Sequence, residues 1–136
     1  MASIQTERVL APGRLTIDLR AIRENYQILK KHVGNDVAIA PVVKANAYGL
    51  GLIECTGALI AAGAQDFFVA TPDEAIALRE AYHQPNVMVL NGFYESYADA
   101  YPEYNLTPVL GSFLEIREYQ SLCRQKKKAL PAFLHF

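Results

Sequence analysis

The residues most able to do chemistry lie around Lys44, which follows directly on the apolar run 37–43. An apolar run of that length without alternation is typical of a strand buried on both faces. A lysine directly after it would lie at the carboxyl end of the strand, where α/β folds place their active sites. A partly buried amine is more readily uncharged, and the uncharged form is a nucleophile. Most lysines at strand ends are nevertheless solvated, so spacing alone favours a solvated Lys44.

The residues after Lys44 are small or carry a hydroxyl group. Tyr48 places a phenol four residues beyond Lys44. Small residues between and after them would let a bulky group approach the backbone: Ala45, Ala47, Gly49 and Gly51. Glycines before a helix are commonly part of turns, which is the alternative interpretation. A dinucleotide-binding loop is not indicated, because Gly49-Leu50-Gly51 lacks the third glycine and the acidic partner of that fingerprint.

Strands and helices alternate along the first half of the chain. Residues 14–18 alternate between apolar and polar side chains, which predicts a short strand. Asp18 is a suitable N-cap for a helix that ends at Gly34. An apolar stripe supports that helix: Leu19, Ile22, Tyr26, Leu29 and Val33. After the buried strand over 37–43, we predict a helix over 52–62 and a strand over 67–70.

Two capping-box patterns mark helix starts in the second half of the chain: Thr71 with Glu74, and Ser112 with Glu115. We expect the second of these helices to run to about Lys126. A stripe of tyrosines from 94 to 101 predicts a helix that stops at Pro102 and packs in the core or in an interface. The remaining apolar runs predict strands over 87–90, 106–109 and 132–136.

The alternation of strands with single helices specifies a parallel sheet with right-handed crossovers, so the predicted fold class is α/β. A doubly wound sheet and a (β/α) barrel both satisfy the pattern. A complete barrel needs roughly 250 residues. A chain of 136 residues would therefore hold about half of one. The last predicted strand reaches the end of the sequence, and we expect the barrel to be truncated there.

Composition and charge exclude several other classes of protein. The chain is 51% hydrophobic and 20% charged, which argues for a core and against disorder. A net charge of −1 does not support nucleic-acid binding, and no apolar stretch suits a membrane helix or signal peptide. The basic cluster over 117–128 is expected to complement a helix end rather than bind phosphate. The two cysteines are too few for a disulfide framework, which indicates a cytoplasmic protein. The three histidines lack the spacing of metal ligands, so no metal site is expected.

One known family shares the pattern around Lys44. Residues 42–51 read Val-Val-Lys-Ala-Asn-Ala-Tyr-Gly-Leu-Gly. This stretch resembles the cofactor-lysine signature of alanine racemases, the pyridoxal-phosphate enzymes of the type III fold. The resemblance extends to further segments: 15–22, 61–64, 68–79 and 87–92. It covers nearly the whole chain and is strongest up to Gly92. Related type III enzymes carry different residues after the lysine, so the signature favours the racemases.

The resemblance implies that residues 1–136 are the N-terminal portion of a (β/α)8 TIM-type barrel that binds pyridoxal 5'-phosphate. The barrel would be truncated at about its fifth strand, with the rest of the barrel and a β domain absent. Lys44 would be the Schiff-base lysine, and would accept and donate the α-proton on the D-alanine face. Tyr48 would hydrogen-bond the cofactor phosphate. The implied reaction interconverts L-alanine and D-alanine for peptidoglycan synthesis.

The resemblance also implies partners for this site. In the family, the base on the opposite face is a tyrosine from the second domain of the partner subunit, so a homodimer is implied. The arginines that face the pyridine nitrogen and the substrate carboxylate also come later in the chain. We therefore expect the 136-residue segment alone to be inactive. Two other interpretations remain, a non-catalytic pyridoxal-phosphate-binding module and a racemase of broader amino-acid specificity.

Overall fold

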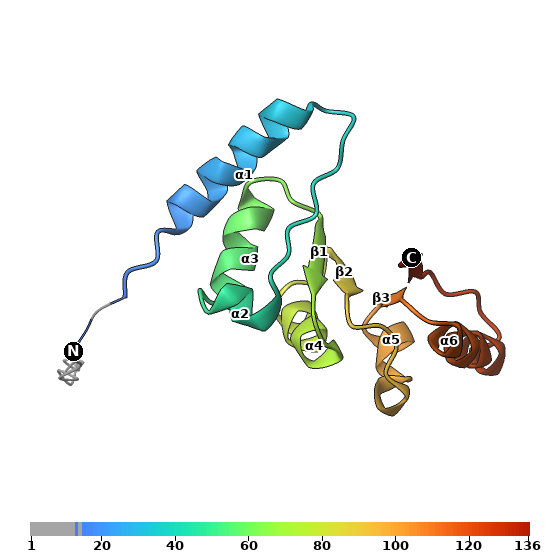
Figure 1. Cartoon of the computed structure of the whole chain (residues 1–136). Coiled ribbons are helices and arrows are strands. Elements are labelled where there is room, and N and C mark those ends of the chain that lie inside the picture. The colour runs from blue at the N-terminus through green and yellow to red at the C-terminus, as the bar shows by residue number, and fades with distance from the viewer. Residues whose placement is uncertain (1–12, 14) are drawn as a thin grey trace.

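Four parallel strands lie side by side in the order in which they occur in the sequence (Figure 1). This computed structural model describes residue 13 and residues 15–136. The strands are β1 (Asp66–Val69), β2 (Asn86–Val89), β3 (Leu106–Leu110) and β4 (Phe133–Leu134). In the register of the sheet, Phe67 lies opposite Val87, Met88 opposite Thr107, and Val109 opposite Phe133.

Helices connect these strands and place each one parallel to the last. The connections are α4 (Pro72–Ala81), the 3-10 turn η1 (Glu95–Tyr97) with α5 (Ala100–Glu103), and α6 (Phe113–Lys126). Figure 1 shows α4, α5 and α6 along one side of the strands. A doubly wound sheet reverses its strand order at a switch point, whereas the strand order here is sequential. The predicted α/β class is confirmed, and the arrangement is that of part of a (β/α) barrel.

The core lies between the sheet and these helices. Phe67, Val69 and Leu78 are fully buried, as are Val87 and Val89 on the neighbouring strand. Phe68, between two buried residues of β1, is only partly buried, and its ring centroid lies 6.2 Å from that of Phe133. In residues 15–136, which include every helix described, none is long and apolar enough to cross a membrane.

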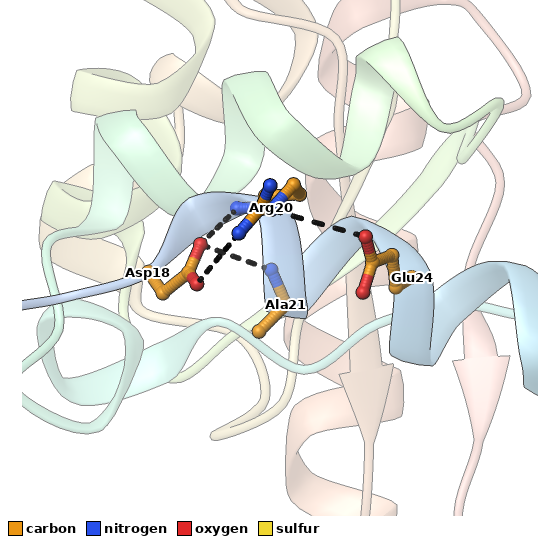
Figure 2. A network of polar contacts seen from close by, with 4 residues as sticks. All are labelled: Asp18, Arg20, Ala21 and Glu24. Atoms are coloured by element: carbon orange, nitrogen blue, oxygen red, sulfur yellow. Dashed lines mark hydrogen bonds and ion pairs between the residues drawn. The ribbon is translucent and has the colours of Figure 1, made fainter.

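The first helix, α1 (Leu19–Val33), has the ends that the sequence predicts. The Asp18 carboxylate accepts hydrogen bonds from the backbone N–H groups of Arg20 at 2.9 Å and Ala21 at 3.2 Å. Arg20 also pairs at 3.9 Å with both Asp18 and Glu24, as Figure 2 shows. These ion pairs are exposed and contribute little, so the N-cap is the stronger stabilising contact. The helix packs along α3 (Leu52–Ala61), the small-residue helix expected over 52–62.

The prediction of a strand over 14–18 is wrong for residues 15–18, which the structure describes. Residues 15–18 form no strand, Leu15 is 76% exposed, and Arg14 lies outside the described residues. An alternating pattern becomes a strand only when a neighbouring strand pairs with its backbone. No such neighbour adjoins residues 15–18 within the part of the chain that the structure describes.

The prediction of a strand over 37–43 is confirmed only at one isolated parallel bridge, between Val42 and Phe68. Val43 donates to the Phe68 carbonyl at 2.8 Å, and the Phe68 N–H donates to the Pro41 carbonyl at 2.9 Å. Burial on both faces is also wrong, because Val37 and Val42 are exposed. The described segment has β1 on one side only, and Pro41 has no N–H to add to a ladder.

The single tyrosine helix predicted up to Pro102 is also wrong. The segment forms η1 and α5, and Pro102 is the third residue of α5. A proline is tolerated there because the first N–H groups of a helix have no intrahelical partner. Core packing is confirmed for Tyr101, which is 1% exposed. Its hydroxyl donates to the Gly92 carbonyl at 2.9 Å and accepts from the Tyr94 N–H at 3.2 Å.

The last helix, α6, runs to Lys126 as predicted. Its N-cap Ser112 accepts a hydrogen bond from the Glu115 N–H at 3.2 Å. Arg124 and Lys126 lie in its last turn, where cations complement the helix dipole. Lys126 pairs with Asp99 at 2.6 Å. The basic residues from Arg124 to Lys128 are therefore at a helix end, as expected, whereas Arg117 lies near the start of α6.

Removing the Tyr101 hydroxyl should destabilise the protein in a pH-dependent manner. Burial raises the pKa of Tyr101 to about 12. The unfolded value is about 10, so the stability from the protonated phenol is complete below pH 10 and is lost as the pH rises through 12. At pH 8, Tyr101→Phe should cost about 1–3 kcal/mol, because the Gly92 carbonyl and Tyr94 N–H lose their partner.

Urea unfolding of the wild type and Tyr101→Phe at several pH values between 8 and 12 would measure this difference. We expect the two free energies of unfolding to converge as the pH rises. A difference that stays constant to pH 12 would contradict the assignment.

Candidate functional site

Lys44 lies where the segment 37–43 passes the carboxyl end of β1. It follows Val43, whose N–H is held by the Phe68 carbonyl at 2.8 Å, and begins the short helix α2 (Lys44–Tyr48). The side chain is half-buried. Among residues 15–136, the lysine amino groups that form hydrogen bonds or ion pairs are those of Lys30 and Lys126, and the Lys44 amino group forms neither.

The α2 helix is a left-handed turn. Ala45, Asn46 and Ala47 have φ of 51°, 55° and 52° with ψ of 51°, 46° and 48°. These angles match a left-handed helix, and Tyr48 continues it with φ 56°. The Ala47 N–H donates to the Val43 carbonyl at 2.8 Å, which closes the turn. Because each non-glycine residue in this conformation costs about 1–2 kcal/mol, the surrounding contacts must hold the turn.

Asn46 makes several of those contacts. Its side-chain Oδ1 accepts a hydrogen bond from the Leu52 N–H at 2.8 Å, at the first residue of α3. The N-cap position of α3 is Gly51, which has no side chain to cap the helix. The Asn46 carbonyl accepts from the Gly51 N–H at 2.9 Å. Asn46 therefore couples the left-handed turn to the start of the next helix.

Glu74 holds the same turn from another connection. Its Oε1 accepts a hydrogen bond from the Asn46 N–H at 3.2 Å, and its Oε2 accepts from the Ala70 N–H at 2.8 Å. Glu74 was predicted to form a capping box with Thr71. The helix does begin after Thr71, but the Thr71 side chain makes no capping bond. The predicted capping box is wrong, because the Glu74 carboxylate accepts hydrogen bonds from Ala70 and Asn46 instead.

Tyr48 and Lys44 occupy opposite ends of the left-handed turn. Tyr48 is 64% exposed, and among the described residues no hydrogen bond joins its hydroxyl to Lys44. A surface hollow of about 620 Å³ lies beside the turn, lined in part by Asn46, Gly49 and Leu50. The turn therefore carries an exposed hydroxyl and borders an open hollow, while the half-buried amine stands at its start.

Sequence reasoning did not assign a role to Asn46 or to the carboxylate of Glu74 as a contact of the turn. A signal for Asn46 was available, because a side-chain amide shortly before a helix with a glycine N-cap can replace the missing cap. The Glu74–Asn46 bond joins residues 28 positions apart. No local pattern contains a contact of that separation.

Comparison with known proteins gives a consistent result. The family model described as alanine racemase, N-terminal domain, matches residues 17–136. The alanine racemase of Rickettsia typhi is 41% identical over 123 residues, which is 90% of this chain and 30% of that protein. A crystal structure of alanine racemase from Bartonella henselae with covalently bound pyridoxal phosphate is 39% identical, with a TM-score of 0.80. The match covers 85% of this chain and 32% of that one.

A histidine racemase is also among the similar structures. This protein, from Leuconostoc mesenteroides, is 30% identical with a TM-score of 0.74 and covers 84% of this chain and 30% of its own. The chain spans about a third of the length of each of these relatives.

Glycine should be tolerated at Ala45 although it destabilises ordinary helices. Ala45 is exposed and left-handed, so Ala45→Gly relieves strain while adding entropy to the unfolded chain. We expect a free energy of unfolding within about 0.5 kcal/mol of the wild type, or higher. The matched control is Ala77→Gly, at an exposed position inside α4, which should cost about 1 kcal/mol. Urea unfolding measures both, and equal costs would contradict the left-handed turn.

Proposed function

Because the chain belongs to the alanine racemase family through its N-terminal domain, we propose that it forms the N-terminal part of a pyridoxal-phosphate-dependent racemase that interconverts L-alanine and D-alanine. The observation that carries the proposal is the half-buried Lys44 amine at the carboxyl end of a strand segment, held by a strained turn. Strain of this kind is concentrated at functional sites.

The groups of the site fit pyridoxal phosphate. The cofactor carries an aldehyde, which needs an amine, and a phosphate, which needs hydrogen-bond donors. Lys44 supplies an amine that no described residue engages, and Tyr48 supplies an exposed hydroxyl four residues later. We assign the covalent attachment to Lys44 and the phosphate hydrogen bond to Tyr48.

In the proposed reaction, Lys44 also moves the proton. Bound pyridoxal phosphate supplies an electron sink for the negative charge left when the α-proton of alanine departs. Once the amino group of alanine has displaced Lys44 from the cofactor, the freed Lys44 Nζ would accept that proton on the D-alanine face and return it there in the reverse direction. Racemisation needs a second group on the opposite face of the α-carbon. We assign that group to the partner subunit of a homodimer.

The wider assignments follow from the same proposal. Residues 1–136 form the N-terminal portion of the cofactor-binding barrel, and the protein acts in the cytoplasm to supply D-alanine for peptidoglycan. A racemase of broader specificity is the second candidate, and the similarity to a histidine racemase supports it. Both candidates assign the same roles to Lys44 and Tyr48, because the side chain of the substrate does not take part in the proton transfer.

Borohydride reduction of the purified protein should attach a pyridoxyl group to Lys44. Reduction makes the bond between the lysine and the cofactor permanent, so peptide mapping by mass spectrometry locates it. We expect the adduct to be absent in Lys44→Ala and retained in Lys31→Ala, a matched control at an exposed lysine of α1. Tyr48→Phe should retain the adduct but need a higher cofactor concentration, because one hydrogen bond to the phosphate is lost.

An unmodified Lys44 in the wild type would exclude the proposed function. An adduct without turnover of alanine or histidine, followed by chiral chromatography, would instead favour a non-catalytic pyridoxal-phosphate-binding module.

A polypeptide restricted to residues 1–136 should not racemise alanine. Lys44 serves one face of the α-carbon, and the proposal places the group for the other face on the second domain of a partner subunit, which a polypeptide of residues 1–136 does not contain. Chiral chromatography after incubation with L-alanine and pyridoxal phosphate would measure this. Turnover above that of free pyridoxal phosphate by a polypeptide of verified mass would contradict the assignment.

A further inference from the structure

Two glutamates occupy the same position in two strand–helix connections. Glu74 is the third residue of α4, and Glu115 is the third residue of α6. Each carboxylate accepts a hydrogen bond at 2.8 Å from the backbone N–H four residues earlier, which belongs to Ala70 or Gly111. Both glutamates therefore fasten the first turn of a helix to the end of the preceding strand.

Each carboxylate also reaches the connection that follows the neighbouring strand segment. Glu115 lies against Gly92, just after β2, so closely that a Cβ atom at Gly92 would collide with its carboxylate. Glu74 accepts a hydrogen bond from Asn46, inside the left-handed turn that follows Lys44. The two glutamates thus share one geometry, and only Glu74 contacts the turn that bears the lysine.

The Glu74 contact is a suitable restraint for that turn. A carboxylate forms a stronger hydrogen bond with a peptide N–H than a neutral acceptor does. The turn also has ties to β1 at Val43 and to α3 through the Asn46 side chain. The Glu74 tie differs from these, because it joins the turn to the start of α4 by a charged group.

We propose that Glu74 is a positioning residue for Lys44, which acts by holding the Asn46 N–H and thereby the left-handed turn. The proposal rests on the proposed function for the role of Lys44, and on the hydrogen bonds alone for the restraint of the turn. Glu74 itself touches neither substrate nor cofactor in this assignment. Its loss should reduce the attachment of pyridoxal phosphate to Lys44 without removing the lysine.

The test compares Glu74→Ala with Glu115→Ala in the protein as its gene encodes it. Both variants lose the bond to the backbone N–H four residues earlier. Glu115→Ala also loses the bond from the Ser112 hydroxyl, so it is the more severe control for the start of a helix. Only Glu74→Ala releases Asn46. Hydrogen exchange of the peptide 42–51 should become roughly tenfold faster in Glu74→Ala and stay unchanged in Glu115→Ala, because a hydrogen bond to a charged group is lost.

The second measurement is the fraction of Lys44 that borohydride reduction labels at a limiting concentration of pyridoxal phosphate. This fraction should fall several-fold in Glu74→Ala and only slightly in Glu115→Ala. Glu74→Gln keeps one acceptor oxygen for the two N–H groups of Asn46 and Ala70, so both properties should lie between those of the wild type and Glu74→Ala. If Glu74→Ala does not fold, Glu74→Gln decides the comparison, since it should still lie measurably between the wild type and no labelling.

The outcomes separate the two proposals. A wild type without a pyridoxyl group on Lys44 means that the proposed function fails, while hydrogen exchange still tests the restraint of the turn. A labelled wild type whose exchange and labelling respond equally to Glu74→Ala and Glu115→Ala overturns the role of Glu74. Faster exchange without a loss of labelling also overturns it, because the turn would then not position Lys44.

Discussion

The left-handed turn after Lys44 is the constraint on which the rest of the site depends. Four consecutive non-glycine residues, Ala45 to Tyr48, have positive φ angles. This conformation is unfavourable for L-residues, so it persists only where the surrounding structure determines it. Here the restraints are main-chain bonds to β1, the Asn46 side chain on α3 and the Glu74 carboxylate on α4. A right-handed turn would bury different N–H groups and lose these partners.

The parallel sheet brings these restraints together. Strands that run in the same direction end at the same edge, and each following helix begins there. The first N–H groups of a helix have no intrahelical partners, so capping side chains gather at this edge as well. Glu74 and Glu115 both belong to this set, and each reaches from its own helix to a neighbouring connection. The tie between a helix and the end of the preceding strand and the contact with an adjacent connection are therefore made by one carboxylate.

Local patterns predict the elements whose stabilising contacts are themselves local. The Asp18 cap and Gly34 define α1, and Ser112 with Glu115 defines the start of α6, because each signal involves neighbours in the sequence. The strands β1 to β4 are predicted by short apolar runs, within one residue at each end for β1 to β3 and within two for β4. The position of Lys44 beside a strand end follows from the same kind of pattern.

The errors concern features that depend on distant neighbours. Residues 15–18 and 37–43 have strand-like sequences, but a strand needs a partner, and no alternating or apolar pattern states whether one is present. The left-handed turn was also not predictable from residue types, because Ala45 and Ala47 favour right-handed helices. Among the contacts that hold it, the hydrogen bond between Asn46 and Glu74 joins residues 28 positions apart.

The residues proposed to react differ from the residues that hold the backbone around them. In the proposed site, Lys44 and Tyr48 supply the amine and the hydroxyl, whereas Asn46 and Glu74 form hydrogen bonds that hold the backbone between them. A residue that only bonds the backbone does not need to face the reacting atoms, so it can lie on a different helix from the lysine. The strain of the turn is offset in part by the Asn46 bond to Leu52, which supplies a partner that the start of α3 needs in any case. Holding the lysine in place therefore requires few groups beyond those that already bond the backbone near the starts of α3 and α4.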